Sequence, residues 1–188
     1  MLQCIFKVAF CGLLRCGEFT CKANQYLRIG DVHLDVQNEL FTLNLPCSKT
    51  DPFRQGVVIT IYENSTLLPV HTMKQYLDMR FNLGATASSP LFIDEFPGGT
   101  ALSREKFLYY LNSLLQILGY PDGQYSGHSF RIGAATSAAA TGVEDHVIKT
   151  LGRWSADCYV RYIRTDAEVV RNAQVKCLPN LITGYMML

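Results

Sequence analysis

The residues of this sequence best suited to chemistry are His128 and Arg131, which stand three positions apart in the stretch YSGHSFRIGAA at residues 125–135. In the first turn of a helix, residues i and i+3 share one face, so an imidazole and a guanidinium would point the same way. A titratable imidazole beside a permanently charged fork can hold a phosphate group and move a proton. The pair alone is weak evidence, because any helix can carry a histidine and an arginine by chance. The rest of the chain must therefore supply matching parts.

The composition is that of a globular protein of one domain. The 188 residues are 48% apolar and 18% charged, which leaves ample material for a buried core. The formal net charge is +1. This balance excludes a chain that is basic throughout, so a basic face for nucleic acid must be local and offset by acidic residues elsewhere.

The cysteines indicate a reducing compartment. There are seven, an odd number, scattered and without a CxxC pair, so we expect buried thiols and neither a disulfide framework nor a zinc site. We expect no cofactor and no metal. The apolar opening is interrupted by Lys7 and followed by Arg15, which favours a core helix over a signal peptide or a membrane span. A chain that begins inside a core helix is expected to be the C-terminal part of a longer protein.

Periodicity predicts an α+β chain that is mostly helical and carries one small three-stranded antiparallel sheet. Apolar residues keep helical spacing over residues 2–14, and the period then changes to two. The strands are expected at residues 26–34, 40–45 and 57–62. Further helices are expected at residues 69–82, 103–118, 128–141, 143–151 and 166–176, with a short one after Ser155 or Asp157. The alanines between positions 134 and 140 should let that helix pack closely against its neighbours.

Further polar residues occur at places that could bring them to a common site. Arg15 and Glu18 are also three apart, so the carboxylate can brace the guanidinium across a helical turn. Taken singly, this pair is best read as a surface ion pair worth about 0–1 kcal/mol. Lys49 and Arg54 stand in the loop between the second and third strands, where two prolines and a glycine place both cations at a hairpin tip. A lysine at such a tip is usually just solvated.

In chain order, these residues resemble the active site of the tyrosine recombinase, or phage integrase-like, family. The catalytic domain of that family uses an arginine in an L-R-x-x-E context, a hairpin lysine, an H-x-x-R pair, a histidine or tryptophan, and a C-terminal nucleophilic tyrosine. The matching residues here are Arg15, Lys49, His128, Arg131, Trp154 and Tyr162. Their motifs read LRCGE, SKT, HSFR, GRW and YIR, and they span about residues 1–172. Each motif is weak alone, whereas the six residues in the family's order are a strong signal. SKTDPFR and YIR look most like eukaryotic, retroelement- or transposon-associated branches.

The resemblance implies metal-free cleavage and rejoining of DNA strands. Tyr162 would attack a phosphodiester and form a 3′-phosphotyrosine link, which a 5′-hydroxyl can later reverse. Arg15 and Arg131 would bind the non-bridging oxygens as forks, a role that lysine fills poorly. By analogy with single oxyanion donors, loss of either arginine would lower the rate on the order of 100- to 1,000-fold.

The remaining roles follow from the same resemblance. His128 is suited to handling the tyrosine proton or a phosphate oxygen, and Lys49 is the candidate acid for the leaving oxygen. Trp154 would donate its indole N–H to the phosphate while forming a wall of the site. Glu18 would hold Arg15 or the hairpin in place.

Two assignments have an alternative in the sequence. Tyr159 stands three residues before Tyr162 on the same helical face and is the alternative nucleophile, although the Tyr-Ile-Arg context favours Tyr162. Arg54 is the alternative hairpin cation. Lys49 is preferred because an ammonium group can give up a proton and a guanidinium cannot.

The resemblance also fixes the expected domain and partners. We expect residues 1–176 to form an integrase-like catalytic domain and residues 177–188 a tail. Full-length relatives carry an N-terminal, largely helical DNA-clamp domain, for which this chain has no room. We therefore expect weak, salt-sensitive binding to double-stranded DNA by this fragment, and we expect a strand-cleaving enzyme that does not complete recombination as the fragment alone. The full-length protein is expected in the nucleus, as a homotetramer on two duplexes, with no membrane association.

Two other functions fit the same residues. One is a non-catalytic DNA-binding module, derived from a mobile element and retaining its active site by descent. The other is a type IB topoisomerase-like DNA relaxation, since that family resembles this one at the same positions.

Overall fold

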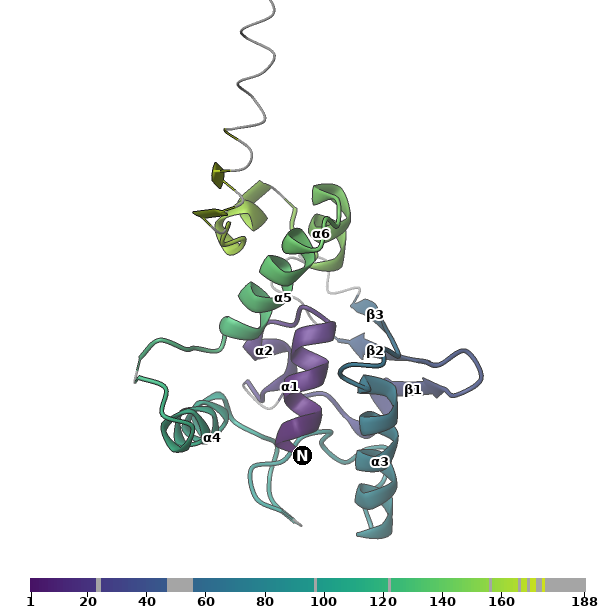
Figure 1. Cartoon of the computed structure of the whole chain (residues 1–188). Helices are drawn as coiled ribbons and strands as arrows, with labels where there is room; N and C mark the ends of the chain where they lie inside the picture. Colours follow the sequence, from purple (N-terminus) through teal and green to yellow (C-terminus); the bar gives the residue numbers. More distant parts are fainter. Residues whose placement is uncertain are drawn as a thin grey trace, which may run out of the picture.

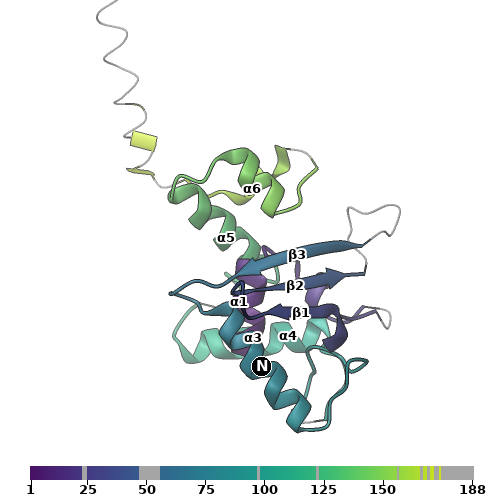
Figure 2. The same ribbon diagram turned by 90° about the vertical axis from the view of Figure 1, so that its right-hand side faces the viewer.

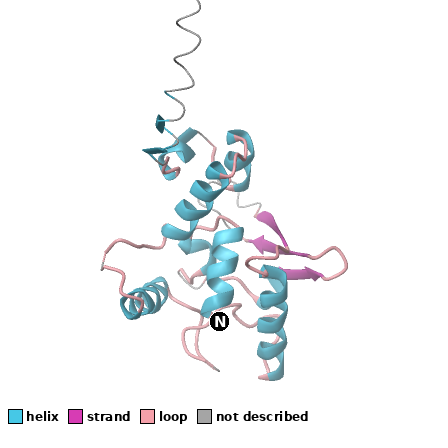
Figure 3. Ribbon diagram, viewed as in Figure 1, coloured by secondary structure: helices cyan, strands magenta, loops and turns pink. Residues whose placement is uncertain are grey.

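The computed structural model describes residues 1–22, 25–46, 56–96, 98–121, 123–155, 157–165, 167–168, 170–171 and 174. Lys49, Arg54 and the predicted tail at 177–188 lie outside these residues, as does much of the predicted helix at 166–176. The helices are α1 (Leu2–Cys11), α2 (Cys16–Phe19), α3 (Pro69–Asn82), α4 (Arg104–Ile117), α5 (Ser129–Ala140) and α6 (Asp145–Leu151). The strands are β1 (Val32–Asp35), β2 (Leu40–Leu45) and β3 (Val57–Tyr62), and the short 3-10 helices are η1 (Ile29–Asp31) and η2 (Asp157–Tyr162). The predicted fold class is confirmed: helices predominate among the described residues, and one small antiparallel sheet lies at one side of the molecule (Figure 3).

Helix α1 lies at the centre of the molecule (Figure 1). Its apolar residues recur at helical spacing, and Ile5 and Ala9 are fully buried. The helix packs against α3 and α5. The main core joins it to Phe41 of the sheet, Met73 of α3 and Phe107 of α4. A helix buried on this scale fixes the position of whatever follows its C-terminal end, and Arg15 follows it closely.

The sheet has the order β1-β2-β3 and is antiparallel throughout, with Val32 opposite Leu43 and Leu45 opposite Val57. The first strand is shorter than predicted. The segment before it pairs elsewhere: the Leu91 N–H donates to Leu27 O at 2.7 Å and the Gly30 N–H to Ala87 O at 2.8 Å. Because those hydrogen bonds hold the segment against residues 87–91, β1 begins only after η1.

The C-terminal end of α1 also differs from the prediction of residue 14. The helix ends at Cys11, and Leu13 takes a left-handed conformation with φ of 45°. The Leu13 N–H donates to Phe10 O at 3.1 Å and the Leu14 N–H to Ala9 O at 2.9 Å, which is the Schellman pattern of helix termination. The turn leaves the Gly12 and Leu13 carbonyls available to side chains from outside the helix.

A second, smaller core joins α5, α6 and η2. Its buried residues are Leu13, Ala134, Ala135, Ile148, Trp154 and Tyr159. As expected from its small side chains, α5 packs against α1, α6 and η2. In the side view, α5 and α6 lie beyond the β3 edge of the sheet, with η2 close to them (Figure 2). Leu13 belongs to this second core and Leu14 to the main one, so the turn after α1 connects the two cores.

Candidate functional site

Arg15 and Glu18 form one side of a polar cluster at the turn between α1 and α2. Arg15 is the N-cap residue of α2, and its backbone N–H donates to Glu18 Oε2 at 2.8 Å. Its side-chain Nη1 donates to Glu18 Oε1 at 3.0 Å. The carboxylate thus satisfies a backbone donor at the start of the helix, where a negative charge is also favoured. The Glu18 side chain is 5% exposed and that of Arg15 is 19% exposed, so Arg15 is the member that reaches solvent.

Arg131 enters the same cluster from the first turn of α5. It is 1% exposed, and its Nη1 donates to Leu13 O at 2.6 Å while its Nη2 donates to Gly152 O. Both acceptors are carbonyls at helix C-terminal ends, of α1 and of α6, where a cation is favoured. Its Nε has no hydrogen-bond partner in the part of the chain that the structure describes. Burial, together with the charges of Arg15 and Arg153, lowers the pKa of Arg131 to about 10, which still leaves it cationic at neutral pH.

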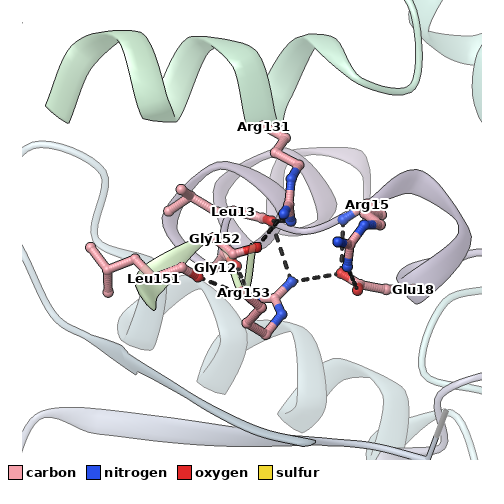
Figure 4. Close-up of polar contacts among 8 residues, drawn as sticks. All are labelled: Gly12, Leu13, Arg15, Glu18, Arg131, Leu151, Gly152 and Arg153. Atoms are coloured by element: carbon pink, nitrogen blue, oxygen red, sulfur yellow. Dashed lines mark hydrogen bonds and ion pairs between the residues drawn. The ribbon is translucent and has the colours of Figure 1, made fainter. Parts of the chain in front are cut away.

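Arg153 is a third guanidinium in the cluster, one for which the sequence predicted no role. Its Nη2 donates to Glu18 Oε2 at 2.8 Å and its Nη1 to Gly12 O at 3.1 Å. Figure 4 shows its guanidinium between the turn after α1 and the Glu18 carboxylate. Burial lowers the pKa of Arg153, an effect that the negative charge of Glu18 opposes. The one available signal was the position of Arg153 in the GRW motif, directly after the glycine that ends a helix.

The Trp154 ring lies against the Arg131 guanidinium. Its ring centroid lies 4.1 Å from the Arg131 guanidinium carbon, a cation–π contact, and the residue is 7% exposed. The ring lies directly over Gly152, where an added Cβ would stand 1.5 Å from the nearest ring carbon. Glycine at position 152 therefore lets the indole ring lie flat against the end of α6.

The two candidate tyrosines lie on η2, and both contact Trp154. The ring centroids are 5.3 Å apart for Tyr162 and 6.1 Å apart for Tyr159. Tyr159 is buried, and its pKa is raised by that burial and by a hydrogen bond with the Asp145 carboxylate. Tyr162 is half-buried, and its hydroxyl lies close enough to Arg131 to influence the pKa of that arginine. Of the two phenols, Tyr162 is thus the more accessible.

His128 is the N-cap residue of α5, directly before the helical turn that carries Arg131. It is exposed, and its carbonyl accepts from the Ile132 N–H at 2.9 Å. The loop before it packs on α2, because an added Cβ at Gly127 would lie 2.7 Å from Cys16 Cβ. This close approach ties the start of α5 to the residue that follows Arg15.

The structure therefore brings together Arg15, Glu18, Arg131, Trp154 and Tyr162 of the predicted residues, with His128 at the adjoining end of α5. Lys49 lies outside the described residues. The cluster holds three guanidinium groups and one carboxylate, which pairs with Arg15 and Arg153, so it has an excess of positive charge in a largely desolvated place, which suits an anion. Within the described ranges, no group of three or more histidine, cysteine or acidic side chains could hold a metal ion. Over the same residues, no helix has the length and apolar character needed to cross a lipid bilayer.

Comparison with solved structures identifies the architecture. XerA recombinase matches over 94% of this chain with 19% sequence identity and a TM-score of 0.68. XerH site-specific recombinase, bound to its palindromic difH substrate after cleavage, matches over 92% with 16% identity and a TM-score of 0.65. The chain has a recombinase fold. The Tn1549 transposon integrase, in complex with a circular intermediate DNA, matches over 92% with 13% identity and a TM-score of 0.60.

The matches cover only part of each solved protein. The chain covers 57% of the XerA chain, 44% of the XerH chain and 57% of the Tn1549 integrase chain, so it spans about half the length of these proteins. No protein-family model and no curated protein matches the sequence. At these identities the likeness concerns the fold, and the chemistry must be argued from the residues of this chain.

Proposed function

We propose that this chain is the catalytic domain of a tyrosine recombinase, which cuts and rejoins DNA strands without a metal ion. The observation that carries the proposal is the cluster in which Arg15 and Arg153 pair with Glu18 and Arg131 donates to the neighbouring Leu13 and Gly152 carbonyls, under the Trp154 ring that Tyr162 also contacts. An excess of fixed positive charge next to a nucleophile is what attack on a phosphodiester requires. The recombinase fold of the chain supports the same reaction, and so do the DNA complexes of XerH and of the Tn1549 integrase.

In the proposed reaction, the Tyr162 oxygen attacks a backbone phosphorus. The bond from that oxygen to phosphorus forms as the bond from phosphorus to the 5′-oxygen breaks. The phenol loses its proton and the leaving 5′-oxygen gains one, so that attack by a 5′-hydroxyl on the phosphotyrosine reverses the reaction. Lys49 is proposed as the donor to the leaving oxygen and His128 as the group that handles the tyrosine proton.

The arginines carry the charge that develops on the phosphate. Arg15, the partly exposed one, is placed to present its remaining N–H donors to a non-bridging oxygen. Arg131 is nearly buried and already donates to two backbone carbonyls, so its direction is fixed before any substrate arrives. Donors that need not reorganise during the reaction stabilise its transition state most effectively.

The geometry favours Tyr162 over Tyr159 as the nucleophile. Tyr159 is 6% exposed, and a raised pKa makes a phenol harder to ionise. Tyr162 is half-buried, so its phenol is the more accessible of the two.

The finer features of the proposal come from the resemblance. They are membership of a eukaryotic, mobile-element branch of the family, a nuclear location, and a homotetramer assembled on two DNA duplexes. An activity of the whole protein would also draw on further chain, since the recombinases of this fold are about twice as long.

The test is covalent trapping of DNA. The protein is incubated at low salt, in buffer containing EDTA, with a pool of nicked suicide duplexes of random sequence, and adducts are resolved on a denaturing gel. We expect an adduct with the wild-type protein and with Tyr159→Phe, and none with Tyr162→Phe. An adduct lost only in Tyr159→Phe would move the nucleophile to that residue.

Two other outcomes would replace the proposal. Binding of duplex DNA without any adduct would make the chain a binding module that keeps the site by descent. Relaxation of supercoiled plasmid by the monomer, without sequence preference, would make it a type IB topoisomerase-like enzyme.

A further inference from the structure

Arg153 occupies a backbone position that favours glycine. It follows the C-cap residue Gly152 of α6 and has φ of 56°, in the left-handed region. Its N–H donates to Thr150 O at 3.0 Å and the Trp154 N–H donates to Lys149 O at 3.0 Å, which completes a Schellman turn. Glycine adopts this conformation without steric cost, whereas other residues lose about 1–2 kcal/mol in it. A strained arginine here indicates that its side chain has a use that offsets the strain.

The Arg153 side chain links two parts of the cluster. On one side it donates to Gly12 O at 3.1 Å, at the end of α1, and on the other to Glu18 Oε2 at 2.8 Å. Its side chain is only 13% exposed, and its Nε is buried without a partner among the described residues. The Gly12 contact joins residues 141 positions apart, so Arg153 connects the end of α6 directly to the turn that carries Arg15.

Glu18 is consequently shared between two guanidinium groups. Its Oε1 accepts from the Arg15 side chain at 3.0 Å and its Oε2 from Arg153 at 2.8 Å. Oε2 also accepts from the Arg15 backbone N–H at 2.8 Å, so among the described residues Arg153 is the one partner that holds the carboxylate from outside the turn after α1. If Arg15 were the sole partner, the carboxylate would largely neutralise it. With Arg153 present, the carboxylate is shared between two cations and part of the Arg15 charge remains available to an incoming anion.

We propose that Arg153 is a positioning residue, which acts through Glu18 to fix the direction and the effective charge of the Arg15 guanidinium. The inference rests on the proposed function for its link to DNA cleavage, and on the geometry alone for its effect on Arg15. Arg153 does not touch the reacting atoms in this assignment. It orients the Arg15 guanidinium, which does contact them.

The first test is kinetic and uses a double-mutant cycle. Single-turnover adduct formation is measured at saturating DNA for wild type, Arg153→Gly, Glu18→Gln and the double variant, where glycine is chosen because it fits the backbone at position 153. By analogy with partners that orient catalytic ligands, we expect Arg153→Gly to lower the rate about 10- to 100-fold, with DNA affinity within about threefold of wild type. In the Glu18→Gln background the same change should alter the rate by less than about threefold, because the group it acts through is already lost.

Two further variants separate positioning from folding and from charge. Arg153→Lys keeps the charge but has a single donor centre, and we expect it to recover only part of the rate. Arg161→Ala removes an exposed cation of η2 outside the cluster and should keep the wild-type rate. A wild-type rate in Arg153→Gly, or rate losses that multiply fully in the double variant, would overturn the proposal.

The second test requires no DNA. Hydrogen exchange of the Arg15 side-chain N–H groups is followed by NMR, with the signal assigned through its absence in Arg15→Lys. We expect exchange at least about tenfold faster in Arg153→Gly than in wild type, with circular dichroism unchanged. If the wild-type protein forms no adduct with any duplex, the proposed function fails, and this measurement still decides the role of Arg153. Unchanged exchange would refute that role whether or not the protein cleaves DNA.

Discussion

Replacing Gly152 by alanine should displace Trp154 from Arg131. The three atoms nearest to an added Cβ all belong to the Trp154 ring, the closest at 1.5 Å, so the ring must move. The loss comprises a desolvated cation–π contact worth about 2 kcal/mol and burial of about 100 Å² of ring surface worth about 2.5 kcal/mol. We therefore expect Gly152→Ala to lower the free energy of unfolding by about 4–5 kcal/mol.

The same substitution should have the opposite sign when the ring is absent. Gly152 has φ of −80° and ψ of −6°, which alanine adopts readily. In a Trp154→Ala background the added methyl group meets no ring, and we expect it to stabilise the protein by about 0.4–1 kcal/mol by reducing the entropy of the unfolded chain. This reversal distinguishes a specific clash from a general intolerance of alanine at position 152.

The assay combines urea unfolding with fluorescence. Trp154 is the only tryptophan in the sequence, so its emission reports directly on the ring. In Gly152→Ala the emission should shift to the red, because the ring leaves a site where it is 7% exposed. An unshifted emission, or the same energetic cost in both backgrounds, would refute the described stacking of Trp154 on Arg131.

Three further outcomes follow from the structure. Gly127→Ala should slow adduct formation at least about tenfold while secondary structure stays unchanged. The added Cβ would lie 2.7 Å from Cys16 Cβ and would push the start of α5 away from α2. A wild-type rate in this variant would contradict the prediction. Burial raises the pKa of Tyr76 to about 12, so the folded protein keeps the phenol proton to a higher pH than the unfolded chain does. The free energy of unfolding should therefore fall as the pH rises from about 10 to 12. Urea unfolding at each pH should show a steeper fall for wild type than for Tyr76→Phe, and parallel curves would be inconsistent with the shift. Iodoacetamide at pH 8, with mass-spectrometric mapping, should label exposed Cys158 and spare Cys4, whose pKa burial raises to about 12; rapid labelling of native Cys4 would contradict its burial.

The helices with strong local signals were predictable from the sequence. The predicted helix at residues 69–82 agrees with α3 (Pro69–Asn82), because proline at the first position and apolar spacing both act locally. Ser103 was expected as an N-cap, and its Oγ accepts from the Lys106 N–H at 3.1 Å. The start of β1 was wrong because the preceding segment pairs with residues 87–91, a contact between distant positions that strand periodicity does not contain.

The candidate site was predictable in its residue types and not in its connections. The order of the motifs pointed to Arg15, Arg131 and Tyr162, whose roles stay predictions until cleavage is measured. The part played by Arg153 could not be read, because it depends on a left-handed backbone that arginine seldom adopts. The end of α1 was missed for the same reason, since nothing in its sequence indicates that Leu13 takes that conformation.

The contacts of Arg131 and Arg153 with the end of α1 have a consequence for the order of events during synthesis. Arg131 Nη1 bonds to Leu13 O across 118 positions, and closing a loop of that size costs about 4 kcal/mol in chain entropy. The turn after α1 leaves the ribosome before its cationic partners, which are translated more than a hundred residues later. A growing chain therefore carries no assembled arginine cluster until Arg153 has emerged and the two cores have docked, which makes the cluster a late marker of completed folding.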